Sequence, residues 1–136
     1  QLVSGDAVLM NRQPTLHKPG IMAHRARVLR SPEMQTIRMH YANCNTYNAD
    51  FDGDEMNCHF PQDQVGRAEA YGLAATERQY IVPTHGAPVR GLIQDHVVAG
   101  VKLTGKNTFL DREEYQQLVV AALTGLGGLD VVPVGE

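Results

Sequence analysis

Three aspartates surround a single glycine in the run Asp50-Phe51-Asp52-Gly53-Asp54. On a helix Asp50 and Asp54 would share a face while Asp52 pointed away, and on an extended strand all three carboxylates would point the same way and repel one another. Gly53 permits a third arrangement, because a glycine with positive φ lets a tight loop curl the carboxylates around one point. Carboxylate oxygens select hard cations such as Mg²⁺, Mn²⁺ or Ca²⁺, and a bound cation offsets their mutual repulsion. The pattern therefore predicts a metal-binding loop.

Two alternatives compete with this interpretation. Aspartate-rich turns are often only solvated, but the apolar neighbours Phe51 and Met56 favour a loop that sits on a core. A calcium-binding EF-hand loop counted from Asn48 would have two aspartates and the glycine in the correct places. Its twelfth position is His59 instead of the required bidentate glutamate, so the EF-hand is disfavoured.

Composition limits the class of protein. A chain of 136 residues with 43% hydrophobic content can build one folded core. The chain has no apolar run as long as a membrane span and no signal-peptide pattern at its start. The two cysteines, Cys44 and Cys58, form no Cys-x-x-Cys element. We therefore expect a soluble intracellular protein with reduced thiols and no contact with a membrane.

Charge is unevenly distributed although the net charge is only −3. Half of the lysines and arginines lie between residues 12 and 38, where Glu33 is the only acid: Arg12, Lys18, Arg25, Arg27, Arg30 and Arg38. A basic segment followed by an acidic loop favours a polyanion together with a metal, because phosphates are attracted by the first and bridged by the second. Any single arginine could equally belong to a solvated charged face.

The first half of the chain has the pattern of short strands. Strands are predicted at residues 7–10, 21–29 and 36–41, with turns at 31–33 and 43–45. Pro14 and Pro19 make residues 13–20 a rigid loop that holds Arg12 at a strand end. Short strands with polar loops are typical of a compact β-barrel or sandwich.

The second half has helical periodicity. Helices are predicted at residues 64–77, at about 92–101 and after Asp111, where Glu114 completes a capping box and Gly125 would end the helix. The change of character near residue 78 is the only candidate domain boundary.

Two motifs resemble a known family. Residues 48–54 are similar to the metal-binding loop in the largest subunit of multisubunit DNA-directed RNA polymerases, and residues 11–17, Asn-Arg-Gln-Pro-Thr-Leu-His, resemble a second signature of that subunit. Residues 23–27, 41–45 and 57–61 are most similar to the RNA polymerase I version. The resemblance covers nearly the whole chain and weakens after about Thr104. Because that subunit is many times longer and this chain begins at Gln1, we expect an excised segment.

The resemblance implies a fold of the α+β class. Residues 1–78 would be the active-site segment, part of a double-psi β-barrel that carries the metal loop and a trailing helix. Residues 79–136 would be mainly helical and begin the following pore-type domain.

The resemblance also implies an activity, template-directed nucleotidyl transfer from NTPs to the RNA 3′ end, in the service of rRNA transcription. Asp50, Asp52 and Asp54 would be the catalytic residues and hold one Mg²⁺, while a second Mg²⁺ arrives with the nucleotide. Arg12 and Asn48 would bind the substrate near its ribose.

The expected partners are the second-largest polymerase subunit, the other polymerase subunits, the DNA template, the RNA transcript and NTPs. The segment would be active only within that complex, in the nucleus and specifically the nucleolus.

Two functions from other classes remain open at this point. A metal-dependent nuclease or phosphatase would use the same carboxylates with water as the nucleophile and a base such as His59. A calcium-binding module would need an acidic residue at that position.

Overall fold

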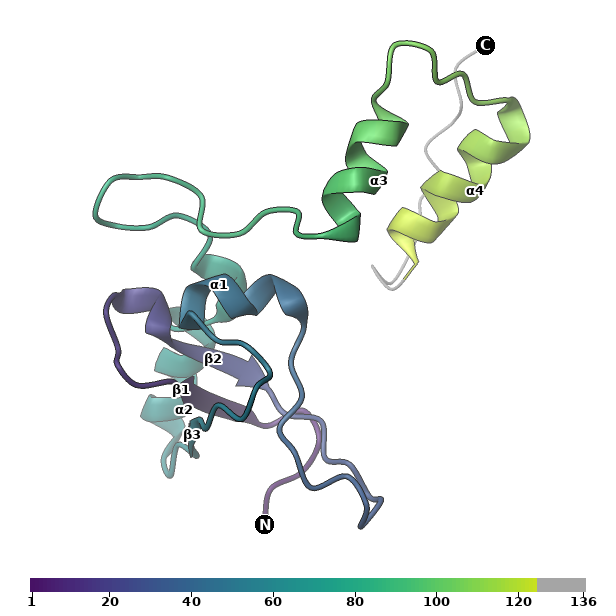
Figure 1. Ribbon diagram of the computed structural model, residues 1–136. Helices are drawn as coiled ribbons and strands as arrows, with labels where there is room; N and C mark the ends of the chain where they lie inside the picture. The colour runs from purple at the N-terminus through teal and green to yellow at the C-terminus, as the bar shows by residue number, and fades with distance from the viewer. Residues whose placement is uncertain (125–136) are drawn as a thin grey trace. The chain divides into compact units, whose positions relative to one another are not determined.

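The computed structural model describes residues 1–124, which fall into two compact units, residues 1–94 and the part from Asp95 onward (Figure 1). No helix in these 124 residues is long and apolar enough to cross a membrane.

The first unit is built on a three-stranded antiparallel sheet. The central strand β1 (Ala7–Asn11) pairs with β2 (Ile21–Arg25) on one side and with β3 (Asn57–His59) on the other. Met10 lies opposite Met22 in the first pair and opposite Cys58 in the second. The end of β1 therefore lies beside the start of β3, the strand that follows the aspartate loop.

The two faces of the sheet carry separate apolar clusters, because successive strand residues point to opposite faces. Val8 and Met10 pack with Met22 and Tyr47. On the opposite face Ala7, Ala23 and Ala70 form a second cluster, with Leu9 and Ala74 packed against it. The sheet thus has α1 (Cys44–Tyr47) on one face and α2 (Gln64–Gly72) on the other.

Short helical turns and caps complete this unit. Three 3₁₀ turns, η1 (Lys18–Gly20), η2 (Tyr41–Asn43) and η3 (Thr76–Arg78), connect the elements. The Asp63 side chain caps α2 by accepting a hydrogen bond from the Gly66 N–H at 2.6 Å. Residues 74–75 run along the outer edge of β2, where the Ala23 N–H donates to the Ala74 carbonyl at 2.7 Å.

The second unit contains α3 (Asp95–Leu103) and α4 (Arg112–Leu123). The predicted capping box is confirmed: the Glu114 N–H donates to Asp111 Oδ1 at 2.8 Å, and the Asp111 N–H donates to Glu114 Oε2 at 3.1 Å. The predicted helix end at Gly125 lies outside the described residues.

The predicted mixture of short strands followed by helices is confirmed, with corrections. The strand predicted at 21–29 ends at Arg25. The helix predicted at 64–77 ends at Gly72, because residues 74–75 leave the helix to pair with Ala23 on the edge of β2. The strand predicted at 36–41 is wrong. Within residues 1–124 its alternating residues pair with no strand: β1 is paired on both sides, residues 74–75 lie along the outer edge of β2, and the segment does not reach the outer edge of β3. The turn predicted at 43–45 is helical, where η2 runs into α1.

Candidate metal centre

The aspartate loop begins where α1 ends. Asn48 adopts a left-handed conformation, with φ 49° and ψ 44°, and the Ala49 N–H donates to the Cys44 carbonyl at 2.9 Å. Gly53 has φ 119°, which confirms the positive φ predicted for it. A side chain at that φ would strain the backbone, so glycine allows the chain to turn back toward β3.

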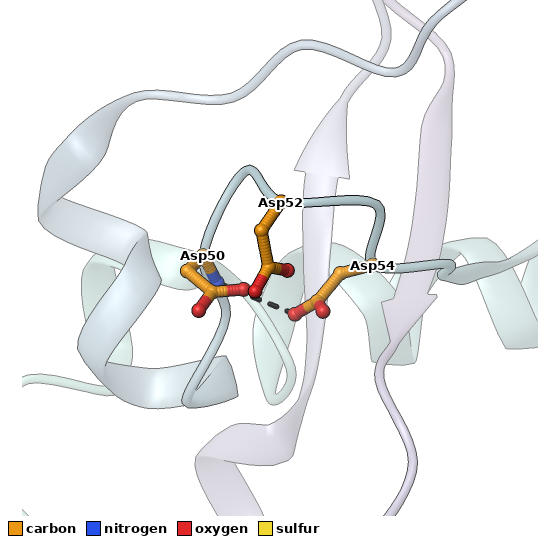
Figure 2. A group of neighbouring side chains, drawn as sticks. All are labelled: Asp50, Asp52 and Asp54. Carbon is orange, nitrogen blue, oxygen red and sulfur yellow. Dashed lines mark hydrogen bonds between the residues drawn. The ribbon is translucent and has the colours of Figure 1, made fainter.

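The loop brings the three carboxylates together (Figure 2). One oxygen from each of Asp50, Asp52 and Asp54 lies within 4.8 Å of the others, and all three residues are exposed. This is the arrangement that neither a helix nor a strand would allow. It is also the only group of three or more potential metal ligands within residues 1–124.

The pKa values of Asp50 and Asp54 are shifted in opposite directions. The side-chain hydrogen bond with Asp52 is the main cause that raises the pKa of Asp50, and the neighbouring negative charges add to it. The hydrogen bond from Arg12 is the main cause that lowers the pKa of Asp54, and the Asp50 N–H, which donates to Asp54 Oδ2 at 3.3 Å, acts in the same direction. The site thus holds excess negative charge on one side and a compensating cation on the other.

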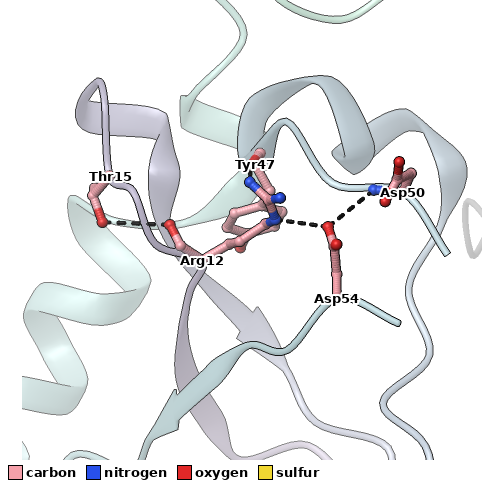
Figure 3. Close-up of polar contacts among 5 residues, drawn as sticks. All are labelled: Arg12, Thr15, Tyr47, Asp50 and Asp54. Carbon is pink, nitrogen blue, oxygen red and sulfur yellow. Dashed lines mark hydrogen bonds and ion pairs between the residues drawn. The ribbon is translucent and has the colours of Figure 1, made fainter. Parts of the chain in front are cut away.

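Arg12 reaches the loop from the end of β1 (Figure 3). Its Nε donates to Asp54 Oδ2 at 2.7 Å, and its Nη1 donates to the Tyr47 carbonyl at 3.4 Å. A guanidinium has five N–H donors, so these two bonds leave donors for another acceptor. The turn after Arg12 is held by Thr15, whose hydroxyl donates to Asn11 Oδ1 at 2.7 Å.

Two polar residues support the loop although the sequence analysis assigned them no role. Tyr47, the last residue of α1, is only 2% exposed, and its hydroxyl lies 2.6 Å from His24 Nε2. His17, in the loop after β1, places its Nε2 2.7 Å from the Thr46 carbonyl. A signal was present in the sequence, since His17 is the last residue of the motif at 11–17, His24 lies in the segment 23–27, and Tyr47 directly precedes the motif at 48–54.

The remaining predicted residues lie around the triad. Asn48 is exposed and precedes Asp50 by two residues. His59, the candidate base of a nuclease, is exposed at the end of β3, opposite Leu9. The loop runs from the four-residue α1 into a strand, so it lacks the second helix that an EF-hand requires. Cys44 and Cys58 are both free thiols.

Two known protein families match this sequence. The family described as RNA polymerase Rpb1, domain 2, matches residues 1–76, and RNA polymerase Rpb1, domain 3, matches residues 79–126. The chain belongs to the Rpb1 family of RNA polymerase largest subunits. The resemblance inferred from the two sequence motifs is thereby confirmed.

Individual relatives within the Rpb1 family are close in sequence. The chain is 64% identical over 129 residues to DNA-directed RNA polymerase I subunit rpa1 of Schizosaccharomyces pombe, with 92% of this chain and 8% of that subunit covered. It is 61% identical over 118 residues to subunit RPA190 of Saccharomyces cerevisiae, with 87% of this chain and 7% of that subunit covered.

Similarity to polymerase III is lower. Identity to DNA-directed RNA polymerase III subunit RPC1 of Homo sapiens is 47% over 124 residues, with 91% of this chain and 9% of that subunit covered. The chain thus matches a segment of the polymerase I largest subunit, a subunit of an enzyme, and spans less than a tenth of the length of these relatives.

Proposed function

We propose that this segment supplies the catalytic centre of a DNA-directed RNA polymerase I, with Asp50, Asp52 and Asp54 holding Mg²⁺. The observation that carries the proposal is the convergence of three carboxylate oxygens within 4.8 Å in a chain of the Rpb1 family. The donor set fits the ion, because Mg²⁺ prefers oxygen ligands and is bound by a few carboxylates together with water and substrate phosphates. The hydrogen bond with Asp52 and, after it, the neighbouring negative charges raise the pKa of Asp50, which shows how closely the carboxylates approach one another.

When bound, Mg²⁺ would activate the RNA 3′-hydroxyl and neutralise charge on the departing pyrophosphate, in the two-metal manner. The residues of this chain prepare that site. Asp50, Asp52 and Asp54 present negative oxygens on an exposed loop, open to the primer end and to an NTP. Arg12 holds Asp54 in its carboxylate form and fixes its orientation through the 2.7 Å bond.

Sugar recognition is proposed for Arg12 and Asn48. Both lie beside the triad, and Arg12 keeps N–H donors beyond those that bind Asp54 and Tyr47. A hydrogen bond to a 2′-hydroxyl would separate an NTP from a dNTP.

The architecture of the complete enzyme is part of the same proposal. We infer that the three-stranded sheet is part of a double-psi β-barrel, that residues 1–78 form the active-site segment, and that residues 79–136 begin a pore-type domain. The open edge of β3 would then pair with barrel strands from elsewhere in the subunit, since unpaired strand edges are normally covered. The segment would act with the second-largest subunit, the other subunits, DNA and RNA, in rRNA transcription in the nucleolus.

The metal assignment is tested by replacing Mg²⁺ with Fe²⁺ in the assembled polymerase and generating hydroxyl radicals. We expect cleavage of this subunit close to residues 50–54, because the radicals form at the bound iron. Cleavage at other places only would refute the assignment.

A matched pair of variants sharpens this test. Asp52→Asn removes one charged ligand and should abolish the local cleavage. Asp63→Asn changes an exposed aspartate in the same way but keeps the α2 cap, because asparagine is also a good N-cap residue. Cleavage should therefore persist in the second variant.

A further inference from the structure

Tyr47 connects both ends of the aspartate loop to the core. Its side chain packs with Val8, Met10 and Met22, and its backbone leads through Asn48 to the first aspartate. Its carbonyl also accepts a hydrogen bond from Arg12 Nη1, and Arg12 binds Asp54 near the end of the loop (Figure 3). A displacement of Tyr47 would therefore move the start of the loop and the residue that holds its far end.

A buried phenol needs a hydrogen-bond partner, because an unpaired hydroxyl in an apolar environment is costly. The partner of Tyr47 is His24, on β2, whose Nε2 lies 2.6 Å from the hydroxyl. The two ring centroids are 5.9 Å apart with an interplanar angle of 34°. This bond joins the end of α1 to the sheet.

The direction of the hydrogen bonds follows from Thr76. Its hydroxyl donates its only proton to the Ala23 carbonyl, at 2.7 Å, so toward His24 Nδ1, at 3.2 Å, it can only accept. His24 therefore carries its proton on Nδ1 and presents a lone pair on Nε2, which accepts the Tyr47 O–H. Burial, aided by the positive charge of Arg90, lowers the pKa of His24 and agrees with a neutral ring, although Glu77 acts in the opposite direction.

From these contacts we propose that His24 and Thr76 are positioning residues for the metal centre, acting through the Tyr47 hydroxyl on the aspartate loop and on Arg12. The hydrogen bonds of both residues go to Tyr47, to the Ala23 carbonyl and to each other, and none goes to the three carboxylates. The inference rests on the proposed function, since it concerns the same triad. The hydrogen bonds of His24 keep the three carboxylates preorganised, so that a lower Mg²⁺ concentration fills the site.

The test uses assembled polymerase carrying single substitutions. His24→Leu removes the acceptor and Tyr47→Phe removes the donor, each with little change of volume. Each should raise the Mg²⁺ concentration for half-maximal nucleotide addition by roughly three- to tenfold, the range expected for one net hydrogen bond. Cleavage near residues 50–54 at low Fe²⁺ should weaken by a similar factor, which gives a readout independent of activity.

Three further variants separate positioning from general stability. His24→Gln places an amide acceptor near the position of Nε2 and should bring the Mg²⁺ requirement back toward that of the wild type. The double variant His24→Leu/Tyr47→Phe should need no more Mg²⁺ than either single variant, because both substitutions remove the same hydrogen bond. His85→Leu, which replaces an exposed histidine of a distant loop, should leave the requirement unchanged.

The outcomes are distinguishable. An unchanged Mg²⁺ requirement in Tyr47→Phe, or the same defect in His24→Gln as in His24→Leu, would overturn the positioning role. If His24→Leu does not assemble, Tyr47→Phe carries the test alone. Persistent local cleavage in Asp52→Asn would instead refute the metal site itself.

Discussion

Arg12 makes two hydrogen bonds in a fixed geometry that a lysine could not reproduce. Its planar guanidinium bonds Asp54 through Nε and the Tyr47 carbonyl through Nη1, so its position is determined by two fixed acceptors. The remaining donors are then held in a known orientation relative to the triad. A lysine ammonium would supply the same charge without the fork.

Substitution of Arg12 in the whole enzyme tests its proposed contact with the ribose. Arg12→Ala and Arg12→Lys should lower kcat/KM for an NTP much more than for the matching dNTP, because only the NTP has the 2′-hydroxyl. Loss of a hydrogen bond to a charged donor costs about 1.5 to 3 kcal/mol, or roughly one to two orders of magnitude in discrimination. Disturbance of Asp54 would lower kcat/KM for the NTP and the dNTP by the same factor. The ratio of the two kcat/KM values is therefore the measurement that reports the ribose contact.

A control for charge is available on the same unit. Arg67 lies 3.6 Å from Asp6 in an ion pair away from the triad, and Arg67→Lys should leave the ratio unchanged. If kcat/KM falls by the same factor for the NTP and the dNTP in the Arg12 variants, Arg12 is a phosphate-binding or structural residue.

At the scale of elements, the metal centre depends on how α1 is attached to β2. The attachment is the hydrogen bond from Tyr47 to His24, and it exists only while the imidazole is neutral. His24 has a pKa below its ordinary 6.5, mainly because it is buried and also because Arg90 is nearby, while Glu77 opposes the shift. The unfolded chain therefore binds this proton at a higher pH than the folded chain does.

The lowered pKa of His24 makes the folded state less stable at acidic pH. The stabilisation is complete above pH 6.5 and declines as the pH falls toward the lowered pKa of folded His24, because the unfolded chain then binds a proton that the folded chain does not. When the pH falls through that lowered pKa, protonation of folded His24 turns Nε2 into a donor and leaves the Tyr47 hydroxyl without an acceptor. We expect the Mg²⁺ requirement of the assembled enzyme to rise as the pH falls through the lowered pKa of folded His24, where the folded state itself becomes protonated. In His24→Gln this rise of the Mg²⁺ requirement should be missing, because glutamine does not titrate. Superimposable pH profiles of the wild type and of His24→Gln would contradict the prediction.

At the scale of the whole molecule, the described chain leaves much apolar surface uncovered. Large apolar side chains such as Leu16 and Phe109 are 77% and 87% exposed, and the sheet has only three strands. Uncovered apolar side chains of this kind are available for packing against other chains or domains. They agree with a segment that spans less than a tenth of its relatives.

We therefore expect the purified 136-residue chain to be inactive by itself. It should incorporate no nucleotide on a primed template, and its thermal unfolding should be poorly cooperative, because strand edges and apolar faces lack their partners. Assembled polymerase under the same conditions is the positive control. Incorporation by the isolated chain would show that the site is complete without other subunits.

Local patterns determined much of what was predictable. Asp50, Asp52, Asp54 and Gly53 specified a carboxylate loop because their spacing suits neither a helix nor a strand, and Asp111 with Glu114 specified the start of α4 because a capping box is made within one turn. The strand at residues 7–10 was also evident, since it is a short apolar run bounded by turn residues.

Contacts between distant residues were decided only by the tertiary structure. Residues 36–41 have the alternation of a strand, but they pair with no strand of the sheet within residues 1–124, because pairing depends on where folding brings a segment and not on its pattern alone. The bonds from Arg12 to Asp54 and from Tyr47 to His24 join residues 42 and 23 positions apart. The sequence by itself determined which groups could bind a metal, because that depends on local spacing; folding decided which side chains hold those groups in place, because that depends on long-range packing of β1, β2 and α1.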